Sequence, residues 1–483
     1  MRTTLSKYII ALAVFAGSTT VGAQQGRLTP KSTMKSGDVV AAADTTRANS
    51  TRANSTRSDS TRADSTKPAA DPTPSLVQTI EIQNMRAFDQ RGINVFESPK
   101  NDGVPYTGFK LAWGAAFTQQ FQGLGHSNSS TPVIKNGVNA NRLISIGHGF
   151  NNAVANLYLN AQLAQGIRVA MTTYLSARRH QETWVKDGYL LIDDSPIKVA
   201  ALQNIMKYVT IRAGHFEINY GDEHFRRTDN GNAIYNPFVG NLLMDAFTTQ
   251  IGGEVYVRNG PWMVMGGMTG GEIRGQVTVP ERRSPAFLGK VGFDQQVAEK
   301  VRLRVTGSFL TQSRSANNTL FTGDRAGSRY YQVMVNTAGT EKDSAWTGNV
   351  QPGFRSETKS WVLNPFVKVG GLEVRGNIER ARGRAATEPE NRKWEQYAGE
   401  ALYRFVDDKL FLGGRYNTVT GQLLGMTNDV SVNRYQIGGG WFLTPTILLK
   451  GEWMTQKYLD FPTTDIRNGG KIKGFMIEGV VAF

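Results

Sequence analysis

From Phe109 to Phe483 the chain repeatedly alternates apolar and polar residues with a period of two. Successive side chains of an extended strand face opposite sides, so each stretch predicts a strand with one apolar and one polar face. The stretches run for roughly ten to thirteen residues, which suits a tilted membrane strand and exceeds the usual strand of a soluble protein. They lie at about 109–121, 152–163, 166–177, 184–193, 205–219, 247–258, 261–270, 286–296, 300–312, 361–370, 372–383, 396–406, 409–420, 432–443, 446–458 and 472–483.

The last stretch, residues 472–483, indicates which face is which. Phe475, Ile477 and Phe483 share one face, whereas Glu478 lies on the other. A strand that ends on an aromatic residue at the C-terminus is typical of outer-membrane barrels, where the ring lies in an interfacial girdle. A half-buried edge strand of a soluble protein would show the same alternation, so the rest of the chain has to decide.

Composition excludes a helical membrane bundle. The mean hydropathy is −0.35, hydrophobic residues make up 40% of the chain, and no run of about eighteen apolar residues follows residue 20. A strand barrel is still allowed, because lipid-facing and lumen-facing residues cancel in any window average. Cysteine is absent, which excludes disulfides and thiolate metal sites and suits passage through an oxidising periplasm.

The connections between the stretches alternate in length, as they do in membrane barrels with short periplasmic turns and longer outer loops. Short links lie at 164–165, 259–260, 297–299, 407–408 and 444–445, and long ones at 122–151, 220–246, 313–360, 421–431 and 459–471. Up-and-down counting gives sixteen strands, with fourteen to eighteen left open. The sequence therefore predicts an all-β, transmembrane, up-and-down antiparallel β-barrel over residues 109–483. We expect its last strand, 472–483, to pair with the first, 109–121, and close the barrel.

The N-terminal part predicts export. Residues 1–23 combine a basic start, a short apolar core and the small residues Val21 and Ala23 before a cleavage site, which is the pattern of a signal peptide. Residues 24–75 contain degenerate T-R-A-N-S repeats with almost no large apolar side chain, so we expect a disordered low-complexity periplasmic tether. We expect residues 76–108 to form a periplasmic pre-barrel segment. Nucleic acid is an improbable partner for an exported chain.

The same alternation assigns a charged set of side chains to the lumen. Each charge on the lipid face near the bilayer centre would destabilise the barrel by roughly 2–4 kcal/mol. The energetic penalty and the residue alternation therefore assign these charges to the same, inward face. The expected inward cations are Lys110, Arg168, Arg212, Arg258, Arg302, Arg304, Lys368, Arg375, Arg404, Arg415, Arg434 and Lys450, and the expected inward acids are Glu254, Glu373, Glu379, Glu400, Glu452 and Glu478. A wide interior that is lined by positive and negative side chains cannot pack as a dry core, so water is expected to fill it. We therefore expect these side chains to line a pore.

The excess of inward cations over acids agrees with the formal net charge of +15. Fixed cations in a low-dielectric tube attract anions, and arginine keeps its charge and matches the oxygens of phosphate and carboxylate. A mild anion preference is therefore expected. The alternative interpretation is that the arginines pair with the acids and only brace the wall.

The long connection 220–246 combines acids, a histidine, paired arginines and aromatic residues. Loops of this length are usually functional or disordered, and the aromatic content favours packing. One hypothesis is a constriction folded into the barrel, where Asp222, Glu223, Arg226 and Arg227 are the candidate residues and both arginines meet the solute. The alternative is an external lid.

Catalytic and metal sites are not indicated. The five histidines lack ligand spacing; His215 and His224 flank Asp222 and Glu223, but polar barrel rims routinely contain such clusters. No G-x-S-x-G, phosphate-cradling glycine loop or H-E-x-x-H motif occurs, so neither an enzyme nor a cofactor is expected.

The chain resembles outer-membrane porins, and among them the phosphate-selective porin-like proteins of Gram-negative bacteria. The likeness is carried by the signal peptide, the barrel alternation, the C-terminal F-M-I-E-G-V-V-A-F, and the block H-F-E-I-N-Y-G-D with Y-N-P-F-V-G-N between His215 and Asn241. The resemblance implies a sixteen-stranded pore, often trimeric, that passes small anions. Phosphate selectors have an arginine ladder on one wall, whereas the inward arginines here are spread over many strands.

The expected function is a passive diffusion channel in the cell outer membrane. Its expected partners are outer-membrane lipid, small anionic or polar solutes and, through the resemblance, further copies in a homotrimer. The alternatives are a plugged or structural barrel that binds surface partners through long loops, and a membrane-embedded hydrolase.

Overall fold

The computed structural model describes residues 81–85, 97, 100, 103–151, 153–176, 183–227, 232–271, 280–321, 330–340 and 345–483. Residues Leu76–Phe483 form one compact unit. The predicted signal peptide and tether lie outside the described residues. The predicted barrel lies within them almost completely, and the pre-barrel segment 76–108 does so in part.

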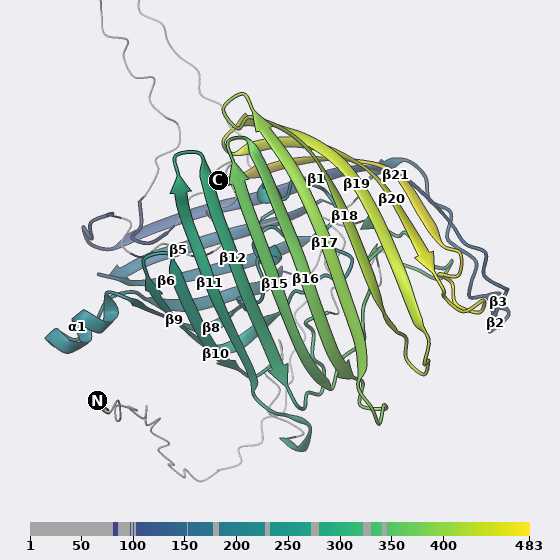
Figure 1. The fold of residues 1–483 in the computed structure, drawn as a ribbon, viewed down its shortest axis with the longest axis horizontal. Coiled ribbons are helices and arrows are strands. Elements are labelled where there is room, and N and C mark those ends of the chain that lie inside the picture. Colours follow the sequence, from purple (N-terminus) through teal and green to yellow (C-terminus); the bar gives the residue numbers. More distant parts are fainter. Residues whose placement is uncertain are drawn as a thin grey trace, which may run out of the picture. The chain divides into compact units, whose positions relative to one another are not determined.

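Sixteen long strands and the two-residue β4 form one antiparallel sheet (Figure 1). The sixteen-stranded barrel predicted from the alternation is thereby confirmed. The long strands are β1 (Lys110–Ser127), β5 (Val154–Ala164), β6 (Ile167–Ser176), β7 (Thr183–Ile192), β8 (Val209–Glu217), β9 (Thr249–Asn259), β10 (Trp262–Thr269), β11 (Ala286–Ala298), β12 (Val301–Gln312), β15 (Glu357–Val369), β16 (Leu372–Arg384), β17 (Arg392–Phe405), β18 (Leu410–Gln422), β19 (Asp429–Thr444), β20 (Ile447–Leu459) and β21 (Lys471–Ala482).

The barrel closes where the first strand meets the last. β1 pairs with β21 antiparallel from Ala116 opposite Ala482 to Ser127 opposite Lys471, as the sequence predicted. At this seam Gly123 lies opposite Phe475, and a Cβ on the glycine would collide with the phenylalanine ring. The glycine therefore lets the ring lie across the seam, and closure leaves no unpaired edge there.

The two faces of each strand differ in exposure as the alternation predicted. On β21, Phe475 and Ile477 are exposed, while Met476 and Glu478 are fully buried. On β1, Trp113 is 72% exposed whereas Ala116 is fully buried. An apolar outward face suits contact with lipid, because no other apolar layer within the described part of the chain covers it.

Short turns join the strands at one end of the barrel, and long loops join them at the other. The short-turn end also carries the connection with α1 (Ala200–Met206). Smaller elements lie in the long connections at the other end: β2 (Ile134–Lys135), β3 (Val138–Asn139), β4 (Gly149–Phe150), η2 (Glu223–Phe225), η3 (Ala233–Tyr235), η4 (Pro280–Arg282), β13 (Tyr330–Tyr331) and β14 (Trp346–Thr347). Among the described residues, no helix has the length and apolar character needed to cross a membrane.

Deletion of Phe483 is expected to reduce barrel assembly severely. The Phe483 N–H donates to the Ala115 carbonyl at 2.9 Å, the Ala115 N–H donates to the Phe483 carbonyl at 3.0 Å, and the Phe483 ring packs edge-on against Trp113. The deletion removes both seam hydrogen bonds and the terminal aromatic ring. The yield of the folded, heat-modifiable band in membrane fractions measures assembly, with Phe483→Tyr as the control that keeps ring and backbone. Normal insertion of the deletion variant would contradict this role.

Candidate functional site

The candidate site is the interior of the barrel. Every charged residue that the sequence assigned to the lumen lies on the buried or half-buried face of its strand. They are Lys110 on β1, Arg168 on β6, Arg212 on β8, Glu254 and Arg258 on β9, Arg302 and Arg304 on β12, Lys368 on β15, Glu373, Arg375 and Glu379 on β16, Glu400 and Arg404 on β17, Arg415 on β18, Arg434 on β19, Lys450 and Glu452 on β20, and Glu478 on β21.

The connection 220–246, named here the inserted segment, runs inside the barrel against its wall. Residues 228–231 of it lie outside the described part of the chain. Its backbone N–H groups bond to inward side chains: those of Val239 and Gly240 donate to Glu452 at 2.9 and 3.2 Å, and that of Leu243 donates to Asn417 at 2.6 Å. Non-helical backbone is tolerated inside a membrane barrel only when it finds such partners. Of the two alternatives for this connection, the structure therefore shows the one folded into the barrel.

Wall cations hold the carbonyl groups of the inserted segment. Lys450 Nζ donates to the carbonyl oxygens of Ala233, Asn236 and Phe238 at 2.7, 2.7 and 3.0 Å. The same ammonium forms an ion pair with Glu478 at 2.7 Å, and neither side chain is exposed. One lysine thus joins the segment to two strands of the wall.

Two wall arginines repeat this arrangement. Arg415 donates to the Gly240 carbonyl at 2.8 Å, and Arg434 donates to the Asn241 carbonyl at 2.7 Å. A Cβ on Gly240 would collide with the hydroxyl of Tyr330, so the packing at this position favours glycine. Such contacts explain why an irregular segment keeps a defined path.

The expectation that all charged wall side chains face water is wrong on this side of the barrel. Lys450 and Glu478 are covered completely, and Glu452 and Arg434 almost completely. The physical reason is that the inserted segment supplies carbonyl and N–H groups that replace water as hydrogen-bond partners. Pairing and bracing, which the sequence left open as an alternative, therefore describe these residues.

Arg226 and Arg227, the arginines expected to meet the solute, are both buried in ion pairs. Arg226 donates to Glu400 at 2.7 Å and contacts Glu223 at 3.3 Å, and Arg227 donates to Asp245 at 2.8 Å. Each arginine side chain is 3% exposed. Contact with a solute would require them to leave these pairs.

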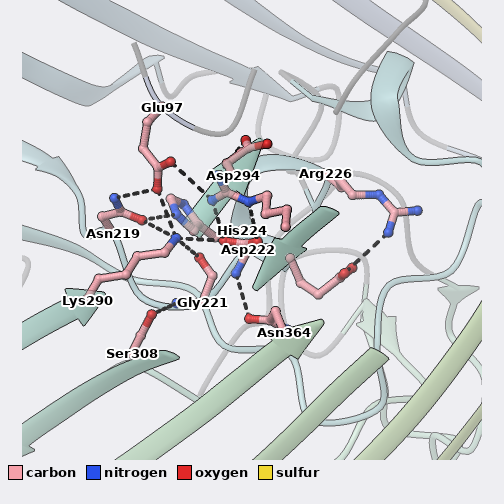
Figure 2. A network of polar contacts seen from close by, with 12 residues as sticks. Glu97, Asn219, Gly221, Asp222, His224, Arg226, Lys290, Asp294, Ser308 and Asn364 are labelled. Atoms are coloured by element: carbon pink, nitrogen blue, oxygen red, sulfur yellow. Dashed lines mark hydrogen bonds and ion pairs between the residues drawn. The ribbon is translucent and has the colours of Figure 1, made fainter. Parts of the chain in front are cut away.

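Asp222 is the centre of a second network, which joins the inserted segment to β11 and β12 (Figure 2). Its carboxylate accepts from Arg304 Nε and Nη2 at 2.9 and 3.0 Å and pairs with Lys290 at 2.7 Å. Its backbone N–H donates to Asn364 Oδ1 at 3.0 Å. Burial alone would raise the pKa of Asp222, but Arg304 and Lys290 outweigh it and hold that pKa well below its ordinary value.

Glu97, from the pre-barrel segment, enters the same network (Figure 2). Its carboxylate pairs with Lys290 and with Arg304, each at 3.1 Å, and accepts from Asn219 Nδ2 at 3.2 Å. Burial would raise the pKa of Glu97, but the two cations lower it from 4.5 to about 2. Two lumen cations and two acids from outside the strands therefore neutralise one another.

The sequence reasoning missed Lys290, Glu97 and a second inserted loop. Lys290 shares the buried face of β11 with Leu288, so the two-residue alternation could have found it. The loop between β12 and β15 also enters the lumen, where Tyr330 donates its hydroxyl to Glu452 at 2.8 Å. Its residues 322–329 and 341–344 lie outside the described part of the chain. No local pattern signals this contact.

Coverage of the inner wall differs around the barrel. On β16 to β21 the inward side chains are nearly all buried. On β5 to β8 several inward side chains are only half-buried, namely Tyr158, Asn160, Ala170, Tyr174 and Arg212. The inserted segment and the second loop therefore pack mainly against one side of the wall.

The histidines near the inserted segment are part of the polar packing. His224 Nε2 lies 3.1 Å from Asn219 Oδ1, and its Nδ1 lies 3.3 Å from Glu217. Within the described ranges, no group of three or more histidine and acidic side chains is arranged to hold a metal ion.

No family model matches the chain, and no curated protein matches it. Among solved structures, it is similar to the outer membrane channel DcaP of Acinetobacter baumannii, with 8% identity and a TM-score of 0.46 over 80% of this chain and 99% of that chain. It is also similar to the anion-selective porin from Comamonas acidovorans, with 10% identity and a TM-score of 0.47 over 78% of this chain and 100% of that chain. A third similar structure is OmpF of Salmonella typhi, with 11% identity and a TM-score of 0.45 over 79% of this chain and 99% of that chain. These values are low, so the function is inferred below from the barrel's own geometry.

The barrel lies in the outer membrane, as predicted. A closed antiparallel barrel with an even number of strands, an apolar outward face, short turns at one end and long loops at the other is the architecture of that membrane. The short-turn end, where the chain terminates, therefore faces the periplasm, and the long loops face outward.

Proposed function

We propose that the protein is a passive outer-membrane channel for small polar and anionic solutes, narrowed by the inserted segment. The observation that carries this proposal is the uneven coverage of the lumen. The segment is fastened to β11 and β12 and along β16 to β21, while several inward residues of β5 to β8 stay half-buried. A water path along β5 to β8 fits this arrangement, because inward polar side chains there, such as Tyr158, Asn160 and Arg212, stay half-buried.

We propose only a mild preference for anions. Many inward cations have an acidic partner, such as Glu400 for Arg415, Glu373 for Arg404 and Glu254 for Arg212. A paired cation contributes little net field at the distance of a passing ion. Selectivity for phosphate, which the resemblance implies, stays a prediction. The inward arginines are spread over separate strands rather than stacked on one wall, which does not favour it.

A plugged barrel that binds partners is the second candidate function. Three parts of the chain favour it by occupying the lumen together: the inserted segment, the loop that contains Tyr330, and Glu97 of the pre-barrel segment. In such a protein the long outer loops would carry the activity.

The proposed mature chain starts after a signal peptide at residues 1–23, and residues 24–75 act as a periplasmic tether before the pre-barrel segment. The homotrimer also stays a prediction, which chemical cross-linking of the protein in its native membrane tests directly.

Recordings from the purified full chain in planar bilayers test the proposed channel. We expect stepwise conductance and, in a potassium chloride gradient, a reversal potential of the sign that shows chloride to be more permeant than potassium. A cation-selective reversal potential would refute the anion preference. Silence in bilayers, together with no swelling of sugar-loaded liposomes, would refute the channel and favour the plugged barrel.

A further inference from the structure

Three basic side chains occupy one row on the outward face of neighbouring strands. Lys359 of β15 lies opposite Arg382 of β16, which in turn lies opposite Lys393 of β17. All three side chains are exposed, and the lysines are more than half exposed. Directly opposed residues on one face of an antiparallel pair lie roughly 5 Å apart, where like charges destabilise the sheet. The barrel therefore keeps an unfavourable cluster of positive charge on the face that meets lipid.

The row lies at the depth of lipid headgroups in the outer leaflet. Trp361, two residues further along β15 toward the periplasmic turn, is 42% exposed on the same face. Two residues of a strand span ~7 Å, and exposed tryptophan and tyrosine rings mark the membrane interface. Tyr397 of β17 is exposed on that face as well. The cations therefore lie just outside the aromatic level, on the side of the long loops.

The carboxylates around the row do not balance its charge. Glu357 pairs with Lys359 at 2.8 Å and is shared with Arg384 at 3.2 Å. Glu395 pairs with Lys393 at 2.8 Å and is shared with Arg380 at 3.1 Å.

Arg382, in the middle of the row, stands apart from these pairs. Throughout the described ranges, no carboxylate lies within ion-pair distance of its guanidinium. An additional anion between the three basic side chains would relieve the repulsion within the row.

We propose that Lys359, Arg382 and Lys393 bind the phosphate group of a lipid in the outer leaflet. The planar guanidinium of Arg382 presents paired N–H donors that match phosphate oxygens, and the flanking ammonium groups add charge from both sides. Clusters of basic side chains at headgroup depth attract anionic lipids. The acyl chains of the same lipid would lie on the apolar outward face below the row. This site is independent of whether the lumen conducts.

The same arrangement recurs on β20 and β21. Lys457 lies opposite Lys471, and Lys473 follows two residues later on the same outward face. Both clusters lie near the outer ends of their strands. A phosphate-bearing leaflet facing this end of the barrel explains why repulsive pairs recur there.

Native mass spectrometry of the purified full chain, with added lipid A as the phosphate-bearing probe, tests the proposal. The test variant is Lys359→Gln, Arg382→Gln and Lys393→Gln. The charge-matched control removes three exposed cations from the periplasmic end, Lys198→Gln, Lys207→Gln and Lys300→Gln. We expect the test variant to bind lipid A at least about tenfold more weakly than the wild type, and the control to bind like the wild type. A heat-modifiable folded band shows that each variant is assembled.

Further outcomes decide the source of the phosphate. Equal binding by the test variant and the wild type would overturn the site, and equal losses in both variants would reduce it to general charge attraction. Inorganic phosphate, added as a competitor to the complex with lipid A, distinguishes the two sources. If inorganic phosphate displaces bound lipid A as well as a second portion of lipid A does, the row is a site for soluble anions and the lipid assignment fails. We expect dephosphorylated lipid A to bind the wild type as weakly as lipid A binds the test variant.

Discussion

Lys450→Met is expected to release the inserted segment, destabilise the barrel by roughly 3–5 kcal/mol and raise the conductance several-fold. The buried ammonium holds three carbonyl groups of the segment, at Ala233, Asn236 and Phe238, and also pairs with Glu478. Methionine keeps the volume but leaves these acceptors buried without a donor. The temperature at which the folded band disappears measures stability, and planar bilayers measure conductance.

Glu478→Gln is the matched control for this change. It removes the ion pair but leaves Lys450 bonded to the three carbonyl groups, so the segment should stay in place and the conductance should change little. The double variant Lys450→Met, Glu478→Met removes the orphaned charge as well, and we expect it to recover stability without recovering the narrow pore. If Lys450→Met keeps the wild-type conductance despite its lower stability, the segment does not limit the flow of ions.

The last strand, β21, shows how much of the fold can be predicted from the sequence. Phe483 fixed the alternation from which Glu478 was assigned to the interior, and the structure confirms both the fully buried side chain and the pairing of β21 with β1. This worked because the period of a strand is local and because every strand of a closed barrel has to present its apolar face to lipid.

The interior of the barrel was harder to predict because its contacts join distant parts of the chain. Arg226 and Glu400 are 174 positions apart, and their hydrogen bond follows from how the inserted segment folds back. Lys290 could have been found from its place beside Leu288 on the buried face of β11. Glu97 could not, since nothing in the residues near it indicates a partner on β11 or β12.

The expectation that inward charges such as Lys450 face water failed on one side of the barrel for a related physical reason. Inward charges such as Lys450 predict water only when no other polar group can reach them. A loop of irregular backbone carries unpaired N–H and carbonyl groups, and it can satisfy those charges as water does. Long polar connections of a barrel are therefore candidate partners for its inward charges.

Asp222→Asn is expected to have the second large effect, a loss of roughly 3–5 kcal/mol in stability at neutral pH. The change removes the charge that Arg304 and Lys290 share. In the network of Figure 2, Lys290 then keeps Glu97 as its acidic partner, and Arg304 keeps Glu97 and the partly exposed Asp294. Glu223→Gln is the control on the neighbouring residue, since its partly exposed carboxylate only contacts Arg226 at 3.3 Å. We expect that control to lose less than about 1 kcal/mol. Similar losses in both variants would contradict a special role for Asp222.

Acid should weaken the same network through Glu97. Because the folded-state pKa of Glu97 lies near 2 and its ordinary value is 4.5, its contribution to stability is fully present above about pH 4.5 and is lost as the pH falls toward 2. Glu97→Gln should therefore lower stability at neutral pH by an amount on the order of 2–3 kcal/mol and flatten the stability profile between those pH values. The melting temperature of the folded band, measured across this range for both proteins, checks the prediction. Parallel profiles for wild type and variant would show that Glu97 does not titrate with folding, and that the pre-barrel segment is held in the lumen by other contacts.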